Sequence, residues 1–536
     1  MAGCSRKWFL HGLPLVLALS GLGVALAAPP APKESGPTED QKIAKLIQLL
    51  GDKDYAVRQR AEEDLAAIGL AAYEALAAAA NHEDLEIAAR ARYLLRKIRG
   101  QWASGQDPPE VQKLLEDYDL QSTEARALAI RALAYLPDLS GTAALCRLVR
   151  FERSAALSDY AAIEIAYSEP FDAASRARFR GLVRASLTAS TRPAAKWLLA
   201  YARLREAPKA AFPEWRKLVE SEYARWQQAP EKVNPEIPVG LLYLLAETYA
   251  DQGDLAAAEK TAQQAQQMPR PSDPFGLSLR MQTAWMLANR GRSDWAEAEY
   301  RFLTNCGQPL IAVDSGQRFA EYLHDQEKDE AAAEVYQKTL DAAAQLRVDF
   351  VVEPSEFIRH CRARMNYFFA CHWAGQKDPV KQLDYLERAL QSDPGEVDTL
   401  IACHRLPSPT PQFRERIAKS IQRQTVQLRD KMAKDPKSAL AYNQFAWLVG
   451  NTQGDLDAAL KASQKSLELS PNNSAYLDTI AHVYFAKGDL ANAVKHQTMA
   501  AQREPHSGLL NSELKRFQAA LEAKTKKVEE NAARQP

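Results

Sequence analysis

The feature that most constrains the fold is a 34-residue period near the C-terminal end of the chain. Two successive segments repeat the same small and turn-forming residues at equal spacing: Gly454-Asp455-Leu456 returns as Gly488-Asp489-Leu490, Ala459 as Ala493, and Pro471 as Pro505. Each period has room for two short helices, with a glycine turn between them and a proline after the second. Helices this short cannot bury their own apolar faces, so successive helical hairpins must stack.

This pattern resembles the tetratricopeptide repeat (TPR), a family whose unit is a pair of antiparallel helices in 34 residues. The resemblance is strongest over 474–507, where Tyr484 fills the space between units and small residues stand where helices cross, at Ala481 and Ala493. In the preceding unit, Trp447 stands where the pattern has a small residue. The resemblance implies two TPR repeats over 438–507.

Looser copies occur earlier in the chain, for example LLYLLAETYADQGDLAAAEKTAQQA. They predict TPR-like repeats over 238–341 and a degenerate TPR-like region over 363–437. An insertion at 342–362 separates the two regions and contains the only β-prone stretch, VDFVVEP, which its proline limits.

The N-terminal part has another pattern of short helices. The string LLGDKDYAVRQRAEEDLAAIG resembles a HEAT-type repeat, in which a helix is followed by an Asp-containing turn and a second helix that Asp54 can cap. We expect HEAT-like helical repeats over 41–165 and an irregular helical region over 166–237. Residues 508–536 are expected to form a C-terminal helix and a charged tail.

Together these patterns predict an all-α fold, an α-α superhelix (solenoid) of stacked helical hairpins, HEAT-like and then TPR-like. The composition agrees, since aromatic residues make up only 8% of the chain and there are just 23 glycines among 536 residues. The apolar fraction rests largely on alanine, which favours closely packed helices over sheets.

Residues 1–27 have the pattern of a secretory signal peptide. Arg6 and Lys7 precede an apolar stretch, and Ala25-Leu26-Ala27 is a small-x-small cleavage site. A Pro-rich linker follows over 28–40. We expect a bacterial protein that is exported, periplasmic or secreted after cleavage; the alternative is an uncleaved membrane anchor. No later stretch is apolar for long enough to span a membrane.

The charge balance argues against a nucleic-acid partner. The chain has 68 basic and 68 acidic residues, and removing residues 1–27 takes away two basic residues and no acidic one, which leaves a net charge of −2. Nucleic-acid binders are usually clearly basic, because they neutralise phosphates.

A search for catalytic and metal-binding motifs finds none: there is no phosphate-binding glycine loop, no GxSxG, no HExxH and no CxxC. We therefore expect a non-enzymatic protein with no catalytic residues, no cofactor and no metal. The alternative is an enzyme or metal-binding protein with a Cys/His site around residues 360–404, where three Cys/His neighbours occur at His360-Cys361, Cys371-His372 and Cys403-His404. The same thiols leave open a Cys371–Cys403 disulfide, although ordinary packing explains them more simply.

The TPR resemblance implies a concave groove lined by the first helix of each unit, which binds an extended peptide or a partner helix. Transferring that groove unit by unit nominates polar and aromatic partner-binding residues, namely Tyr243, Glu247, Glu321, His324, Tyr367, Gln444, Asn451, Asp478 and His482. The resulting hypothesis is a protein–protein interaction scaffold or adaptor in an exported assembly. Envelope or outer-membrane assembly is one setting for it.

Overall fold

The computed structural model describes residues 39–98, 102–231, 233–344, 354–471 and 473–533. The signal peptide predicted at 1–27, the linker up to residue 38, and all but the last residue of VDFVVEP lie outside the described residues. Within these ranges the regular elements are all helices, α1 to α26, with three short 3-10 helices and no strand. The predicted all-α fold of stacked helical hairpins is confirmed.

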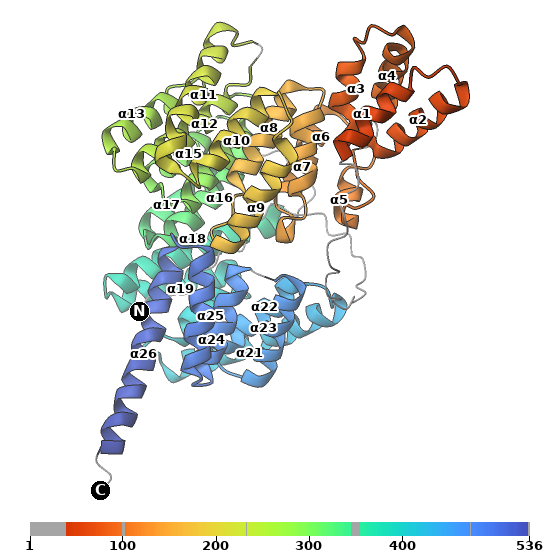
Figure 1. Cartoon of the computed structure of the whole chain (residues 1–536). Helices are drawn as coiled ribbons and strands as arrows, with labels where there is room; N and C mark the ends of the chain where they lie inside the picture. Colours follow the sequence, from red (N-terminus) through yellow and green to blue (C-terminus); the bar gives the residue numbers. More distant parts are fainter. Residues whose placement is uncertain (1–38, 99–101, 232, 345–353, 472, 534–536) are drawn as a thin grey trace. The chain divides into compact units, whose positions relative to one another are not determined.

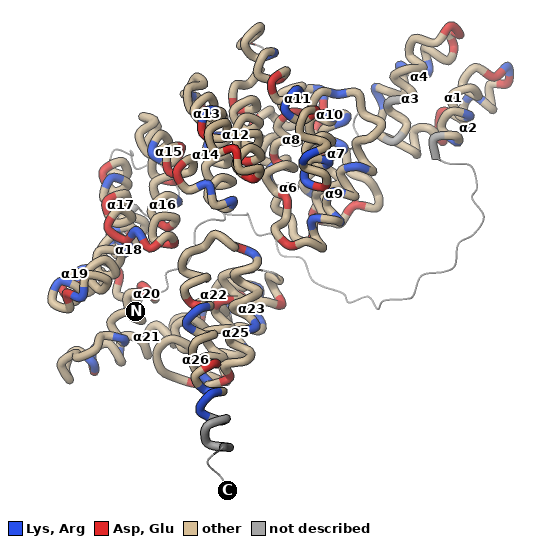
Figure 2. The backbone as a smooth tube through the Cα atoms, turned by 60° about the vertical axis from the view of Figure 1, so that its left-hand side comes forward, with Lys and Arg blue, Asp and Glu red and all other residues tan. Residues whose placement is uncertain are grey.

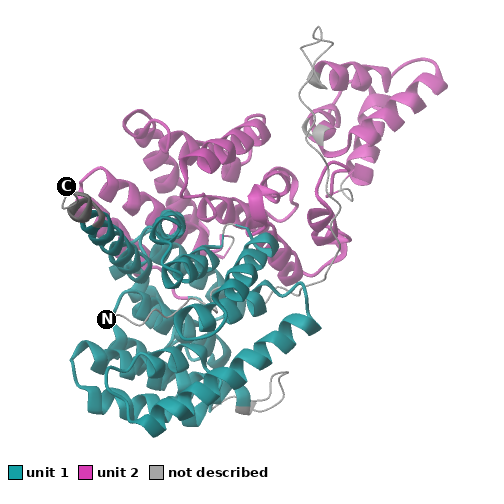
Figure 3. Ribbon diagram, turned by 90° about the horizontal axis from the view of Figure 1, so that it is seen from below, with its two compact units in different colours: residues 1–20, 271–536 teal, residues 21–270 magenta. Residues whose placement is uncertain are grey.

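The described residues fall into two compact units, coloured separately in Figure 3. The N-terminal unit (unit 2 in Figure 3) ends at Arg270. Its helices are α1 (Glu39–Leu49), α2 (Tyr55–Ile68), α3 (Tyr73–Ala79), α4 (Leu85–Ile98), α5 (Pro109–Leu114), α6 (Thr123–Ala134), α7 (Thr142–Phe151), α8 (Ala155–Tyr167), α9 (Ala173–Leu187), α10 (Pro193–Leu204), α11 (Pro208–Gln228), α12 (Glu236–Asp251) and α13 (Leu255–Gln266).

The first hairpins of this unit form as the sequence predicts. Asp54 caps α2 by accepting a hydrogen bond from the backbone N–H of Ala56 at 2.8 Å, and Gly69 ends the helix with a φ of 68°. Asp84 caps α4 in the same way, through the N–H of Glu86. The apolar stripe of α4 is buried, comprising Ile87, Ala91, Leu94, Leu95 and Ile98. Capping and amphipathic spacing therefore set these helices locally.

The C-terminal unit (unit 1 in Figure 3) contains the described residues from Pro271 onward. Its helices are α14 (Pro274–Asn289), α15 (Ser293–Leu303), α16 (Pro309–Asp325), α17 (Asp329–Ala343), α18 (Pro354–Gly375), α19 (Pro379–Ser392), α20 (Val397–His404), α21 (Pro411–Lys434), α22 (Ala439–Asn451), α23 (Leu456–Leu469), α24 (Ser474–Ala486), α25 (Leu490–Arg503) and α26 (Gly508–Ala533). Neighbouring helices pack in pairs along the chain, as Figure 1 shows for α22 to α25.

The repeated Gly-Asp-Leu sequence has a clear local role. Gly253, Gly454 and Gly488 each have a positive φ, of 85°, 136° and 75°, which turns the chain between the two helices of a hairpin. The aspartate that follows caps the second helix; for example, Asp455 accepts hydrogen bonds from two backbone N–H groups. In the α16–α17 turn, Glu327 takes this left-handed conformation with a φ of 60°.

Small residues let the helices of the last repeats approach closely, as predicted. Ala481 and Ala493 are fully buried and pack with Phe517 of α26. Trp447, the departure from the repeat pattern, is also fully buried. The large indole is therefore part of the core of this unit.

Candidate functional site

The nine nominated partner-binding residues lie on the first helices of their hairpins, α12, α16, α18, α22 and α24. Eight of them are buried, and only Gln444 keeps a partly exposed side chain. Three of those in the C-terminal unit, Glu321, Asn451 and His482, belong to a connected set of buried side chains. Their role in binding a partner stays a prediction.

The centre of this set is Arg364 on α18, which is only 3% exposed. Its guanidinium donates to both carboxylate oxygens of Glu321 on α16, at 3.0 and 2.7 Å. It also donates to Asp398 on α20 at 2.8 Å and to Glu396 at 3.4 Å. Burial opposes the charge, but the surrounding carboxylates outweigh it and raise the pKa of Arg364 well above its usual value. A bidentate arginine pair of this kind fixes the relative position of the helices that carry it.

Further contacts extend the set toward the C-terminal end. The indole N–H of Trp447 on α22 donates to the second oxygen of Asp398 at 2.8 Å. The His482 ring on α24 packs edge-on against Trp447 with centroids 4.8 Å apart, and its Nδ1 lies 2.9 Å from Oδ1 of Asn451. On its other side, His482 Nε2 lies 3.4 Å from the carboxylate of Glu513 on α26.

We call this set the inner polar network: Glu321, Arg364, Glu396, Asp398, Trp447, Asn451, His482 and Glu513. It connects helices of five successive hairpins, from α16 to α24, with α26. Buried charges are tolerated only when they are paired and hydrogen-bonded, and here the partners come from different helices. The arrangement is therefore suited to holding hairpins in register.

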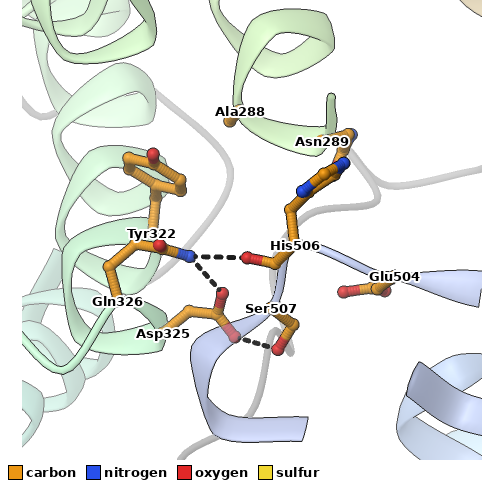
Figure 4. A pocket seen from close by; sticks show the side chains of 8 residues that line it. All are labelled: Ala288, Asn289, Tyr322, Asp325, Gln326, Glu504, His506 and Ser507. Carbon is orange, nitrogen blue, oxygen red and sulfur yellow. Dashed lines mark hydrogen bonds between the residues drawn. The ribbon is translucent and has the colours of Figure 1, made fainter. Parts of the chain in front are cut away.

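A second long-range contact joins the α25–α26 turn to the ends of α14 and α16 (Figure 4). Ser507 donates to Asp325 at 2.6 Å, and the side chain of Gln326 donates to the backbone carbonyl of His506 at 3.0 Å. The His506 ring lies over Gly291, where an added Cβ would clash with the ring and lie 2.7 Å from its Cγ. A small pocket is lined by Asp325, Gln326, His506 and Ser507, together with Ala288, Asn289, Tyr322 and Glu504. The local sequence does not predict this contact, because Gln326 and His506 lie 180 residues apart.

The cysteine and histidine neighbours do not converge on one site. The five described cysteines are free thiols, so Cys371 and Cys403 are not bonded to each other. Cys361 accepts a hydrogen bond from Gln317, Cys403 is buried in α20, and His404 is exposed. Burial raises the pKa of Cys361 to about 12, which keeps that thiol protonated at neutral pH.

Among the described residues, no helix combines the length and the apolar character needed to cross a membrane.

The family model of the tetratricopeptide repeat matches residues 239–270, which contain most of α12 and all of α13. No curated protein matches the chain. A tetratricopeptide repeat protein from Parabacteroides merdae is 14% identical in sequence, covers 52% of this chain and 98% of its own, and superposes with a TM-score of 0.29. The APC/C hetero-tetramer Cut9-Hcn1 is 12% identical, with coverage of 74% and 97% and a TM-score of 0.20. The chain is thus a helical-repeat protein with a tetratricopeptide match in one hairpin.

Proposed function

We propose that the protein is a non-enzymatic interaction scaffold or adaptor in an exported assembly, periplasmic or secreted, that binds a peptide or helix of a partner protein. The observation that carries the proposal is the hairpin at 239–270, which matches the TPR family model and is followed by further stacked hairpins. Arrays of this kind bind partners through many modest contacts spread over a long surface.

The surface charge supports a protein partner over a nucleic acid. Acidic and basic residues are mixed along both units (Figure 2), and their total numbers are equal. A mixed distribution of this kind favours a protein partner, because phosphate binding uses clustered basic residues. We also propose that the N-terminal hairpins are HEAT-like repeats and form part of this scaffold.

Gln444 marks the place where contact with a partner is easiest to detect. It is the nominated residue whose side chain reaches solvent, and it lies on α22, the first helix of its hairpin. Gln464 is the matched control, because it is the same residue type, is exposed, and lies on α23, the second helix of that hairpin. A partner that binds along the first helices should contact Gln444 and not Gln464.

We expect a photo-crosslinking amino acid at position 444 to capture a discrete partner protein in intact cells of the source organism. The same amino acid in place of Gln464 should capture none. The adduct is expected in the exported fraction, on a chain that begins at Ala28. Equal adducts from both positions, or none from either, would count against the scaffold, and a cytoplasmic chain that keeps residues 1–27 would count against export.

A further inference from the structure

Three side chains capable of binding a metal ion converge where α16, α17 and α18 meet. They are His324 in the last turn of α16, Asp329 at the start of α17, and Cys371 on α18. One donor atom from each residue lies within 4.8 Å of the other two. It is the only such group of three among the residues that the structure describes.

The hairpin turn explains why these residues meet. Glu327, with a φ of 60°, reverses the chain within a few residues, so that the end of α16 and the start of α17 are held together. His324 and Asp329 are consequently in contact, with the imidazole Nδ1 hydrogen-bonded to the carboxylate. Because α18 packs against α17, Cys371 completes the group from the next hairpin.

The histidine is held rigidly, with one ring nitrogen facing the Asp329 carboxylate. Its ring stacks on Phe368 with centroids 4.3 Å apart and meets Tyr367 edge-on at 5.9 Å. The side chain is only 2% exposed, and its Nδ1 faces the Asp329 carboxylate, to which it is hydrogen-bonded. An ion bound on this side of the ring would take Nδ1 and a carboxylate oxygen as ligands, in place of that hydrogen bond.

The chemical types of the three donor groups indicate which ion this site would bind. One thiolate, one imidazole and one carboxylate suit a borderline metal such as zinc, which binds all three types. A Cys-His-Asp nucleophile is the other chemistry that such residues serve, but it needs a thiol of lowered pKa. Here burial, reinforced by the negative charge of Asp329, raises the pKa of Cys371 well above its usual value. A bound cation would instead lower the pKa of this thiol, because the cation takes the deprotonated sulfur as a ligand.

We propose that His324, Asp329 and Cys371 bind one Zn²⁺ ion, with water at the remaining position. Binding replaces the thiol proton of Cys371 with the metal and releases that proton to solvent, so no oxidant or reductant is involved. The ion would tie three consecutive helices of the C-terminal unit together. This inference does not depend on the proposed scaffold function.

The test is titration of the full, chelator-stripped chain with Co²⁺, which replaces zinc and reports a thiolate ligand by an intense near-ultraviolet charge-transfer band. We expect one ion per chain with that band. Cys371→Ser should abolish the band. His324→Gln and Asp329→Asn should each weaken binding by about tenfold or more.

Two control residues lie on the same helix as Cys371. Cys361→Ser removes the other thiol of α18, which is fully buried. His372→Gln removes the histidine next to Cys371; His372 itself lies 3.9 Å from Glu330. Both variants should bind Co²⁺ like the unchanged chain. The absence of a stoichiometric band, its survival in Cys371→Ser, or its loss in Cys361→Ser would each overturn the proposal. If Cys371→Ser fails to fold by circular dichroism, Asp329→Asn decides the matter, because Asp329 is only partly buried and its amide variant keeps the shape of the side chain.

Discussion

Replacing Arg364 with methionine is expected to lower the stability of the hairpins α16–α19 by about 3–5 kcal/mol, the cost of breaking a buried ion pair from one side. The substitution leaves Glu321, Glu396 and Asp398 without their shared cation, and all three are buried. Hydrogen exchange measured by mass spectrometry on peptides of 309–392 reports this loss locally, without assuming that the two units unfold together.

Arg388→Met is the matched control for that experiment. Arg388 pairs with Asp384 on the surface of α19, where both side chains are about half exposed. Exposed pairs of this kind contribute about 0–1 kcal/mol, so exchange should hardly change. If Arg364→Met costs no more than Arg388→Met, the carboxylates around Arg364 are solvated or protonated, and the inner polar network does not hold the hairpins together.

Trp447→Ala is expected to cost about 3–5 kcal/mol, as for other fully buried aromatic side chains. The repeat pattern alone leads to the opposite expectation, since it has a small residue at this position. In the structure the indole is fully buried, contacts the His482 ring and donates to Asp398. Alanine therefore opens a cavity and leaves a buried carboxylate oxygen without its donor. The shift of the urea midpoint, with exchange of α22 and α24 peptides, measures the loss.

Trp447→Phe separates the two contributions. Phenylalanine keeps most of the ring but removes the N–H, so it should cost about 1–3 kcal/mol, the usual penalty for an unsatisfied buried acceptor. An alanine variant as stable as the unchanged chain would show that the repeat accepts its usual small residue here and that the indole makes no net contribution.

The local parts of the fold could be predicted from the sequence because their causes are local. A glycine with positive φ followed by an aspartate cap makes the hairpin turn at Gly454-Asp455 and again at Gly488-Asp489. The spacing of apolar residues predicted α4 and the first hairpins of the N-terminal unit, because this spacing is also a local property of the sequence. Residues 1–38, which carry the export hypothesis, lie outside the described residues.

The burial of the nominated residues could not be predicted in this way. The repeat pattern puts Glu321, Asn451 and His482 on the first helices correctly, but their partners come from other hairpins and from α26. One signal was present: Arg364 stands among Cys361, Phe368 and Cys371 at helical spacing, so a charge lies on an otherwise apolar stripe. A buried charge in such a stripe predicts a carboxylate partner, although not which one.

The cluster at Cys371 was missed for a related reason. Cysteine and histidine neighbours in sequence point in different directions along a helix, so Cys371 and His372 do not share a site. Cys371 instead meets His324 and Asp329, which a hairpin turn brings together and the packing of α18 completes.

The most direct test of the inner polar network is a double-mutant cycle between Arg364→Met and Asp398→Asn, read by hydrogen exchange across α16 to α22. Each single change removes one side of the contact at 2.8 Å and leaves the other side buried without it, whereas the double change removes both sides. We predict a coupling of about 2–3 kcal/mol, with the double variant clearly more stable than the sum of the single effects implies. Additive effects, with a coupling below about 0.5 kcal/mol, would contradict the claim that these buried charges hold successive hairpins together.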